Sequence, residues 1–283
     1  MSQVLTAEQR ERYHRDGILF PIPALSPGEV ARFRAAFEDL AGRLGGRPVA
    51  QALAQTHLYF RWAYELATYP AVLDAVEDVL GPDILVWTVS IFPKYPRDPG
   101  YISWHQDGTY WGLDSREVTT AWIALTDSTG ESGCMRVAPG SHRHPILPHR
   151  DTYAPDNRLS RGQEVQVEVA AQDAVDVVLQ AGQMSLHHVN IIHGSTPNRS
   201  DRSRIGFAIR FTTPKTRQIE GEPPTAVLAR GRDDYHHFEL LAAPPALGVE
   251  EAVAAQQAAG RRLVTALRKT TGHYATGDRG DPS

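Results

Sequence analysis

Two potential metal ligands stand two residues apart in the segment Trp104-His105-Gln106-Asp107-Gly108. On an extended strand, residues i and i+2 point to the same side, so His105 and Asp107 could offer an imidazole and a carboxylate to one ion. The distant His193, in Ile192-His193-Gly194, is the candidate third ligand. Two histidines and one carboxylate leave half of an octahedral ion open, which is the ligand set of non-haem Fe(II) oxygenases. The spacing alone also fits a surface loop with an unrelated His and Asp, because the chain has 12 histidines.

The elements that would hold these ligands follow from the hydrophobic pattern. Short runs rich in β-branched and aromatic residues, separated by Gly, Pro, Asn and Asp, predict the strands of an all-β sandwich or barrel. These runs are residues 84–92, 118–125, 165–169, 175–179, 184–192 and 205–213. Residues 17–20 could form one more strand. The first third otherwise predicts helices, because capping-box patterns start at Thr6 and Ser26 and a helical region covers 57–80 with a break near Pro70.

No linker divides the chain, so we expect one domain over residues 1–283. Within it, 1–82 would be a helical flank and 83–213 the β-rich part that carries the metal ligands. Residues 214–270 would form an irregular segment and an Ala-rich helix over 250–269, and 271–283 a disordered tail. Residues 141–163 predict a long loop.

Composition narrows the functional class. The formal net charge of −4 comes without a basic block, so we expect no nucleic-acid partner. No stretch reaches the roughly 18 apolar residues that a membrane span needs, so we expect no membrane partner. Cys134 is the single cysteine, which excludes an intrachain disulfide and a Cys-rich zinc site. Without a signal-peptide pattern, we expect a cytoplasmic protein.

Five blocks follow one another between about residues 84 and 213. They are Trp104–Asp107, Ala121–Leu125, Glu131–His142, His193–Ser200 and Arg204. In content and order they resemble the phytanoyl-CoA dioxygenase family. The resemblance implies a mainly β, double-stranded β-helix (jelly roll) with flanking helices. It also implies an enzyme that uses Fe(II), 2-oxoglutarate and O₂ to hydroxylate or otherwise oxidise a C–H bond of a small-molecule substrate, releasing succinate and CO₂.

The resemblance further implies which residues bind 2-oxoglutarate. Family members use an arginine eleven residues after the distal histidine to hold the far carboxylate, and this count leads to Arg204 rather than to Arg202. Arginine suits the task, because its planar fork can pair with both carboxylate oxygens. Ser195, Trp122 and Thr88 match further cosubstrate positions, with core packing as the alternative for each.

Other residues near the motif are candidates for the substrate. Tyr110 and Trp111 follow the metal motif and would face the mouth of the barrel, and Gln106 is a third, tentative contact although strand parity points it the other way. Either His187 or His188 should lie near the site, with a core histidine as the plainer interpretation.

Two other functions fit parts of the pattern. A non-catalytic jelly-roll protein could bind a metal or ligand, but a fixed cation such as Arg204 deep in a barrel needs an anionic partner. A metal-dependent hydrolase would need a general base, and the sequence offers none. Halogenation is disfavoured because halogenases of the family replace the carboxylate ligand with a small residue, whereas Asp107 is present here.

Overall fold

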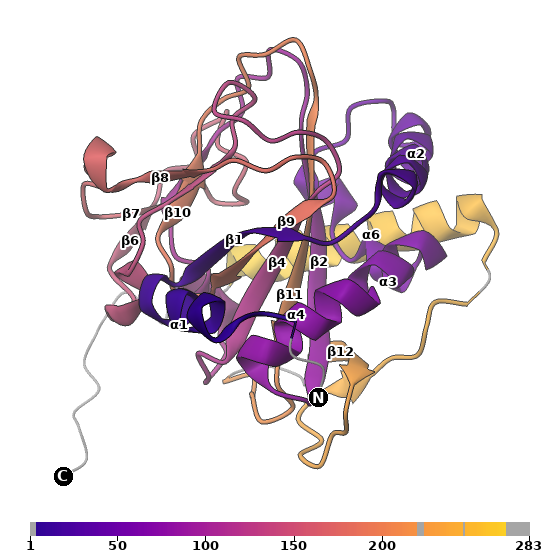
Figure 1. The fold of residues 1–283 in the computed structure, drawn as a ribbon. Helices are drawn as coiled ribbons and strands as arrows, with labels where there is room; N and C mark the ends of the chain where they lie inside the picture. Colours follow the sequence, from indigo (N-terminus) through magenta and orange to yellow (C-terminus); the bar gives the residue numbers. More distant parts are fainter. Residues whose placement is uncertain (1–3, 220–223, 246, 270–283) are drawn as a thin grey trace.

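The computed structural model describes residues 4–219, 224–245 and 247–269. Two β-sheets face each other, and helices cover the outer side of the larger sheet (Figure 1). The arrangement is a double-stranded β-helix with helical flanks, which confirms the predicted fold class.

The larger sheet has seven strands. In spatial order they are β1 (Ile18–Pro23), β9 (Gln183–His188), β4 (Val118–Ala124), β11 (Arg204–Thr212), β2 (Ile84–Lys94), β12 (Thr225–Arg230) and β13 (Glu239–Leu240). The smaller sheet has four strands, in the order β3 (Ile102–His105), β10 (His193–Ser195), β5 (Met135–Val137) and β8 (Val175–Val177). Strands β6 (His149–Asp151) and β7 (Gln163–Val165) form a separate pair. Neighbouring strands are antiparallel except for β12 and β13.

The two faces of the larger sheet differ, and β11 shows how. Its odd-numbered residues are apolar and pack into the core between sheet and helices, as do Ile205, Phe207, Ile209 and Phe211. Its even-numbered residues face the smaller sheet, and they are Arg204, Gly206, Ala208 and Arg210. Because side chains alternate along a strand, one face builds the core while the other is left for a site.

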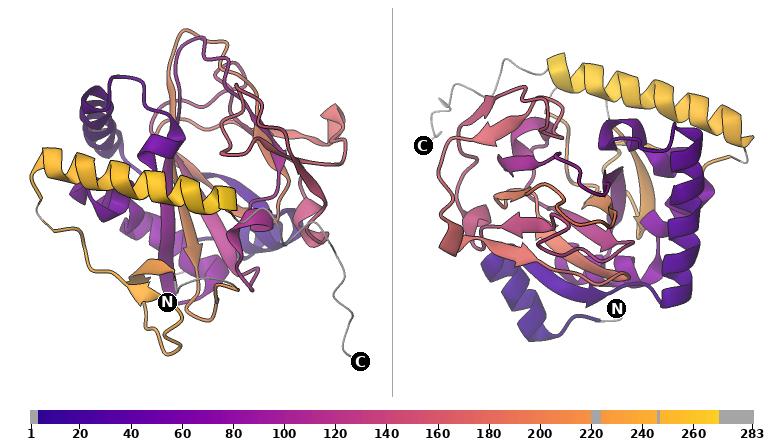
Figure 2. Two further views of the ribbon diagram at one scale, coloured as in Figure 1. Left: turned by 180° about the vertical axis from the view of Figure 1, so that it is seen from behind. Right: turned by 90° about the horizontal axis from the view of Figure 1, so that it is seen from above.

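The helices cover the outer face of this sheet. They are α1 (Ala7–Asp16), α2 (Pro27–Arg43), α3 (Arg61–Ala67), α4 (Pro70–Leu80) and α6 (Val249–Lys269). The single turn of α5 (Gly108–Trp111) instead follows β3, and short 3₁₀ turns lie at Ala50–Leu53, Thr56–Leu58, Ser141–Arg143 and Ala171–Asp173. Thr6 and Ser26 form complete capping boxes, as predicted. Figure 2 shows α6 lying along one side of the molecule. There Gln256 donates hydrogen bonds to the carbonyls of Ala52 and Ala54, which ties α6 to the first 3₁₀ turn.

Several predicted boundaries were wrong. The run 165–169 is largely outside a strand, and the run 184–192 ends as a strand at His188. Strand β5 was missed, because three residues give too little periodicity, whereas β3 and β10 were expected from the metal motif and not from a hydrophobic run. The segment 214–245 was expected to be irregular, yet it supplies β12 and β13. The expected tail, 271–283, lies outside the described residues.

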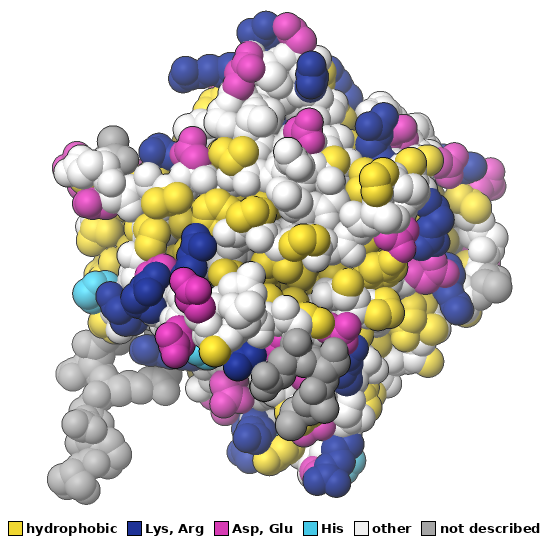
Figure 3. All heavy atoms as spheres, in the orientation of Figure 1, with side chains coloured by type: hydrophobic (Ala, Val, Ile, Leu, Met, Phe, Trp, Pro, Cys, Tyr) yellow, Lys and Arg dark blue, Asp and Glu magenta, His cyan; other side chains and the backbone are white. Residues whose placement is uncertain are grey.

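Among the described residues, no helix is both long enough and apolar enough to cross a bilayer. On the face drawn in Figure 3, basic and acidic side chains are interspersed rather than gathered by sign.

Candidate metal centre

The predicted metal ligands meet between the two sheets. Strands β3 and β10 are neighbours in the smaller sheet, and their register places His105 directly opposite His193. One ligand atom each from His105, Asp107 and His193 lie within 4.8 Å of one another. The imidazole centroids are 4.2 Å apart, and His105 Nε2 is 3.3 Å from the Asp107 carboxylate. Three potential ligands from distant segments therefore surround one point.

Asp107 reaches this point by a different route from the one predicted. Strand β3 ends at His105, and Asp107 has helical backbone angles (φ −58°, ψ −40°) at the start of α5. The prediction that both residues lie on one extended strand was wrong. The chain turns after His105, and this turn directs the carboxylate back toward the imidazole.

Both histidines present the same nitrogen to this point. His105 Nδ1 lies 2.9 Å from the carbonyl of Ser103, and His193 Nδ1 lies 3.1 Å from the carbonyl of Ile191. A carbonyl can only accept, so each Nδ1 carries the proton and each Nε2 keeps its lone pair free. Metal-binding histidines typically make such a bond from their second nitrogen. The donor set therefore fits a divalent transition metal.

The electrostatics also suit a cation. Burial lowers the pKa of His193 to about 4, and the neighbouring His105 contributes in the same direction. Burial raises the pKa of Asp107, but its close contact with His105 and the proximity of His193 outweigh that effect and hold the pKa below its usual range. Near neutral pH the neutral imidazole of His193 therefore lies beside an ionised Asp107 carboxylate.

A cavity of about 70 Å³ connects the three ligands with Arg204. Arg204 is 2 % exposed, whereas Arg202 is exposed, so the structure separates the two candidates. Nε and Nη2 of Arg204 are buried and have no hydrogen-bond partner among the described residues. A buried guanidinium with two free donors is costly unless an anion pairs with it.

Ser195 and Trp122 line the stretch between the ligands and Arg204. The Ser195 hydroxyl lies 2.6 Å from Nζ of Lys94, a buried lysine that pairs across the strands with Arg204. The Trp122 ring lies 5.3 Å from the Arg204 guanidinium. The indole of Trp122 occupies the space that a side chain at position 206 would need, because a Cβ on Gly206 would lie 1.8 Å from the indole. Lys94 was missed because nothing in the sequence distinguishes it.

Two assigned side chains lie elsewhere. Thr88 is the strand partner of Arg210, six residues along β11 from Arg204, and does not line the cavity. This position does not support a contact with the far carboxylate of 2-oxoglutarate. Gln106 is fully buried, and its amide bonds the carbonyl of Asn190 and the N–H of Leu147. Its tentative assignment to the substrate is corrected to a structural one.

Of the two aromatic substrate candidates, Trp111 and Tyr110, only the side chain of Trp111 is described by the structure. Trp111 packs edge-on against Trp87, with ring centroids 5.1 Å apart, and the Arg210 guanidinium lies 5.5 Å from the Trp111 ring. Trp111 itself does not line the cavity, but it contacts Arg210, which does. The backbone of Tyr110 belongs to α5, and its side chain lies outside the described part of the structure.

The two neighbouring histidines point in different directions. His187 lines the cavity, with its ring 5.2 Å from that of His193. His188 instead packs beside His142, with ring centroids 5.1 Å apart. Of the two candidates, His187 is therefore the one that faces the site.

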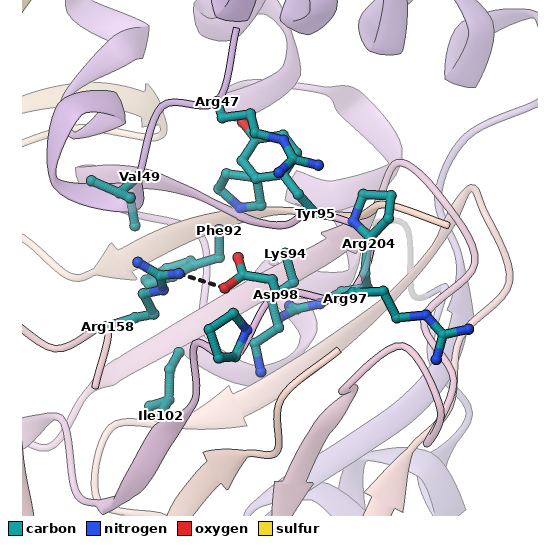
Figure 4. Close-up of a pocket in the computed structure, with 14 residues that line it drawn as sticks. Arg47, Val49, Phe92, Lys94, Tyr95, Arg97, Asp98, Ile102, Arg158 and Arg204 are labelled. Carbon is teal, nitrogen blue, oxygen red and sulfur yellow. Dashed lines mark hydrogen bonds and ion pairs between the residues drawn. The ribbon is translucent and has the colours of Figure 1, made fainter. Parts of the chain in front are cut away.

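A wider cavity of about 310 Å³ adjoins the first one at Arg204, Phe92 and Ile102 (Figure 4). The ionisable groups on its wall include the arginines Arg47, Arg97, Arg158 and Arg204, the amine of Lys94 and the carboxylate of Asp98. Asp98 is the single acidic residue among them, and Figure 4 shows it paired with Arg158. The wall is therefore predominantly cationic, which favours the approach of an anion to Arg204.

Comparisons with known proteins show the family of the chain. Residues 13–206 match the family model of phytanoyl-CoA dioxygenase (PhyH). A probable phytanoyl-CoA dioxygenase of Caenorhabditis elegans is 25% identical over 236 residues, which cover 74% of this chain and 75% of that one. The solved structure of the non-heme monooxygenase ThoJ has a TM-score of 0.78 at 34% identity, covering 93% of this chain and 98% of that one. The non-heme alpha-ketoglutarate-dependent carbocyclase SnoK from nogalamycin biosynthesis has a TM-score of 0.62 at 25% identity, with coverages of 87% and 95%. The chain belongs to the phytanoyl-CoA dioxygenase family.

Proposed function

We propose that this protein is an Fe(II)- and 2-oxoglutarate-dependent dioxygenase that oxidises a C–H bond of a small molecule. In the proposal, Nε2 of His105, Nε2 of His193 and the carboxylate of Asp107 hold the iron. Arg204 receives the far carboxylate of 2-oxoglutarate. The observation that carries the proposal is the buried, unpaired guanidinium of Arg204 in the same cavity as the three ligands. A protein that only bound a metal would have no use for this charge.

Each side chain has a task that follows from its contacts. The bonds from Nδ1 to backbone carbonyls keep His105 and His193 in the tautomer and orientation that ligation needs. Lys94 orients the Ser195 hydroxyl, which can then donate to the cosubstrate. The indole of Trp122 and the side chain of Met135 keep the cosubstrate channel apolar between its charged ends. Because these groups are already fixed in position, they need not reorient during the reaction as water molecules would.

When bound, iron supplies the redox chemistry, which couples the oxidation of 2-oxoglutarate by O₂ to the oxidation of the substrate. One oxygen atom of O₂ enters succinate and the other enters the hydroxylated product, and CO₂ leaves. The protein contributes alignment, exclusion of water and charge balance.

Iron-loaded protein tests this proposal. Under anaerobic conditions, adding 2-oxoglutarate should produce a visible charge-transfer band, and admitting O₂ should release succinate. His193→Ala should lose both, whereas His144→Ala, which alters an exposed histidine, should keep them. A wild-type protein without the band, or a His193→Ala variant that retains it, would contradict the proposal.

A further inference from the structure

Three polar side chains form a row across the larger sheet beside the candidate metal ligands. Arg210 on β11 is the direct partner of Thr120 on β4, and Thr120 is the direct partner of His187 on β9. All three line the same cavity as His105 and His193. Neighbouring strands lie about 4.8 Å apart, so one small ligand can contact the whole row.

Each member of the row has a buried polar atom without a hydrogen-bond partner in the described chain. These atoms are Nε of Arg210, Oγ1 of Thr120 and Nδ1 of His187. Buried polar groups are nearly always paired, because leaving one unpaired forfeits its hydrogen bonds with water without replacement. Three such atoms lie on adjacent strands in matching register and face one cavity. They indicate a binding site for a polar group of a ligand.

The guanidinium of Arg210 is held in place but not neutralised. It lies 5.7 Å from the Phe92 ring and 5.5 Å from the Trp111 ring, and its Nη1 donates to Ser90 over 2.8 Å. The Asp107 carboxylate is near enough to attract this charge, but in the proposed holoenzyme Asp107 is a ligand of the metal. The Nε edge remains open, and this edge of an arginine pairs with both oxygens of a carboxylate.

Charge balance also calls for an anion at this row. In the proposed holoenzyme, Fe(II) and Arg204 together carry three positive charges, which the carboxylate of Asp107 and the cosubstrate dianion balance. Burial lowers the pKa of Lys94 to about 6, so its amine is mostly neutral at physiological pH. The charge of Arg210 is left over, and water cannot neutralise it.

We propose that the row of Arg210, Thr120 and His187 binds a carboxylate of the primary substrate, so that the enzyme oxidises a small carboxylic acid. The inference rests on the proposed function and adds the substrate class to it. Arg210 would pair with the carboxylate through its Nε edge, while the Thr120 hydroxyl and the His187 imidazole donate to the remaining lone pairs. The row lies next to His193, so the acid is held beside the metal, across from the cosubstrate carboxylate at Arg204.

The test uses two fluorinated probes of the same shape. One is 3,3,3-trifluoropropionate and the other is its primary amide, each titrated by ¹⁹F NMR against protein loaded anaerobically with Fe(II) and saturating 2-oxoglutarate. The charge-transfer band, recorded in parallel, reports whether the cosubstrate stays bound. Zn(II)-loaded protein is the diamagnetic reference, because Fe(II) broadens the signal of a bound fluorine only when it is near the metal.

We expect the acid to bind with Fe(II)-dependent broadening, and the amide to bind at least tenfold more weakly. Arg210→Gln should weaken binding of the acid by about tenfold to a hundredfold, as for a lost charge-assisted pair. Arg202→Gln, which removes an exposed arginine near the same strand, should not change it. Should Arg210→Gln fail to give the band, Thr120→Val serves instead, with an expected loss of about threefold to tenfold.

Equal binding of acid and amide, an acid signal unaffected by the metal, or an unchanged affinity in Arg210→Gln would each overturn the assignment. A missing charge-transfer band in the wild type would instead refute the proposed function. The two failures are therefore distinguishable.

Discussion

Replacing Arg204 by methionine should weaken the binding of the far carboxylate of 2-oxoglutarate and leave the binding of its keto-acid end unchanged. The guanidinium is buried, and Nε and Nη2 are both free to pair with one carboxylate. Two charge-assisted hydrogen bonds contribute about 3–5 kcal/mol together, so Arg204→Met should raise the dissociation constant of 2-oxoglutarate roughly 10²- to 4 × 10³-fold. Without cosubstrate, the variant should be more stable than the wild type, because a buried unpaired charge is removed.

The assay is an anaerobic titration of the Fe(II) protein, followed through the charge-transfer band. Pyruvate, which has the keto acid but no far carboxylate, is the matched ligand, and its affinity should be the same with and without Arg204. Arg202→Met is the matched protein control. A change of less than about threefold for 2-oxoglutarate, or an equal loss for pyruvate, would refute this account of Arg204.

Three further predictions concern stability and pH. Burial and a neighbouring guanidinium lower the pKa of Lys94 from 10.5 to about 6. Between pH 6 and pH 10.5, Lys94 is therefore protonated in the unfolded chain and neutral in the folded one. The free energy of unfolding of the metal-free protein should then rise by roughly 1 kcal/mol per pH unit in this range. Lys94→Met should flatten this slope in urea unfolding at pH 6, 7 and 8, and a slope identical to that of the wild type would contradict the assignment. Gly206→Ala should displace the Trp122 indole, lower the melting temperature and weaken 2-oxoglutarate binding, whereas Gly42→Ala, where a Cβ meets nothing, should do neither. Because burial lowers the pKa of His193 to about 4, its imidazole in the metal-free protein should stay neutral at pH 5 and gain a proton only toward pH 4, and an NMR titration midpoint near pH 6.5 would count against this.

The sequence alone was enough to predict the features of the site and the fold that depend on ordered motifs. The three candidate metal ligands and Arg204 were selected because their types and offsets match one family, and the structure brings all four to one cavity. The long strands of the larger sheet were found because β-branched runs of seven or more residues show clear periodicity.

Other features depended on tertiary structure. The turn that directs Asp107 toward His105 cannot be read from a His-x-Asp spacing, since a strand and a turn both allow it. Lys94 became part of the site only because its strand pairs with that of Arg204. The cross-strand row of Arg210, Thr120 and His187 needs the register of three strands that are far apart in the chain, and one sequence does not contain it.

The most direct test of the central claim is an anaerobic crystal structure with Fe(II) and 2-oxoglutarate, recorded at the iron absorption edge. We expect one anomalous peak within coordination distance of His105, Asp107 and His193, a cosubstrate that chelates it, and a far carboxylate paired with Arg204. Iron bound elsewhere, or 2-oxoglutarate in another orientation with Arg204 still unpaired, would contradict the account.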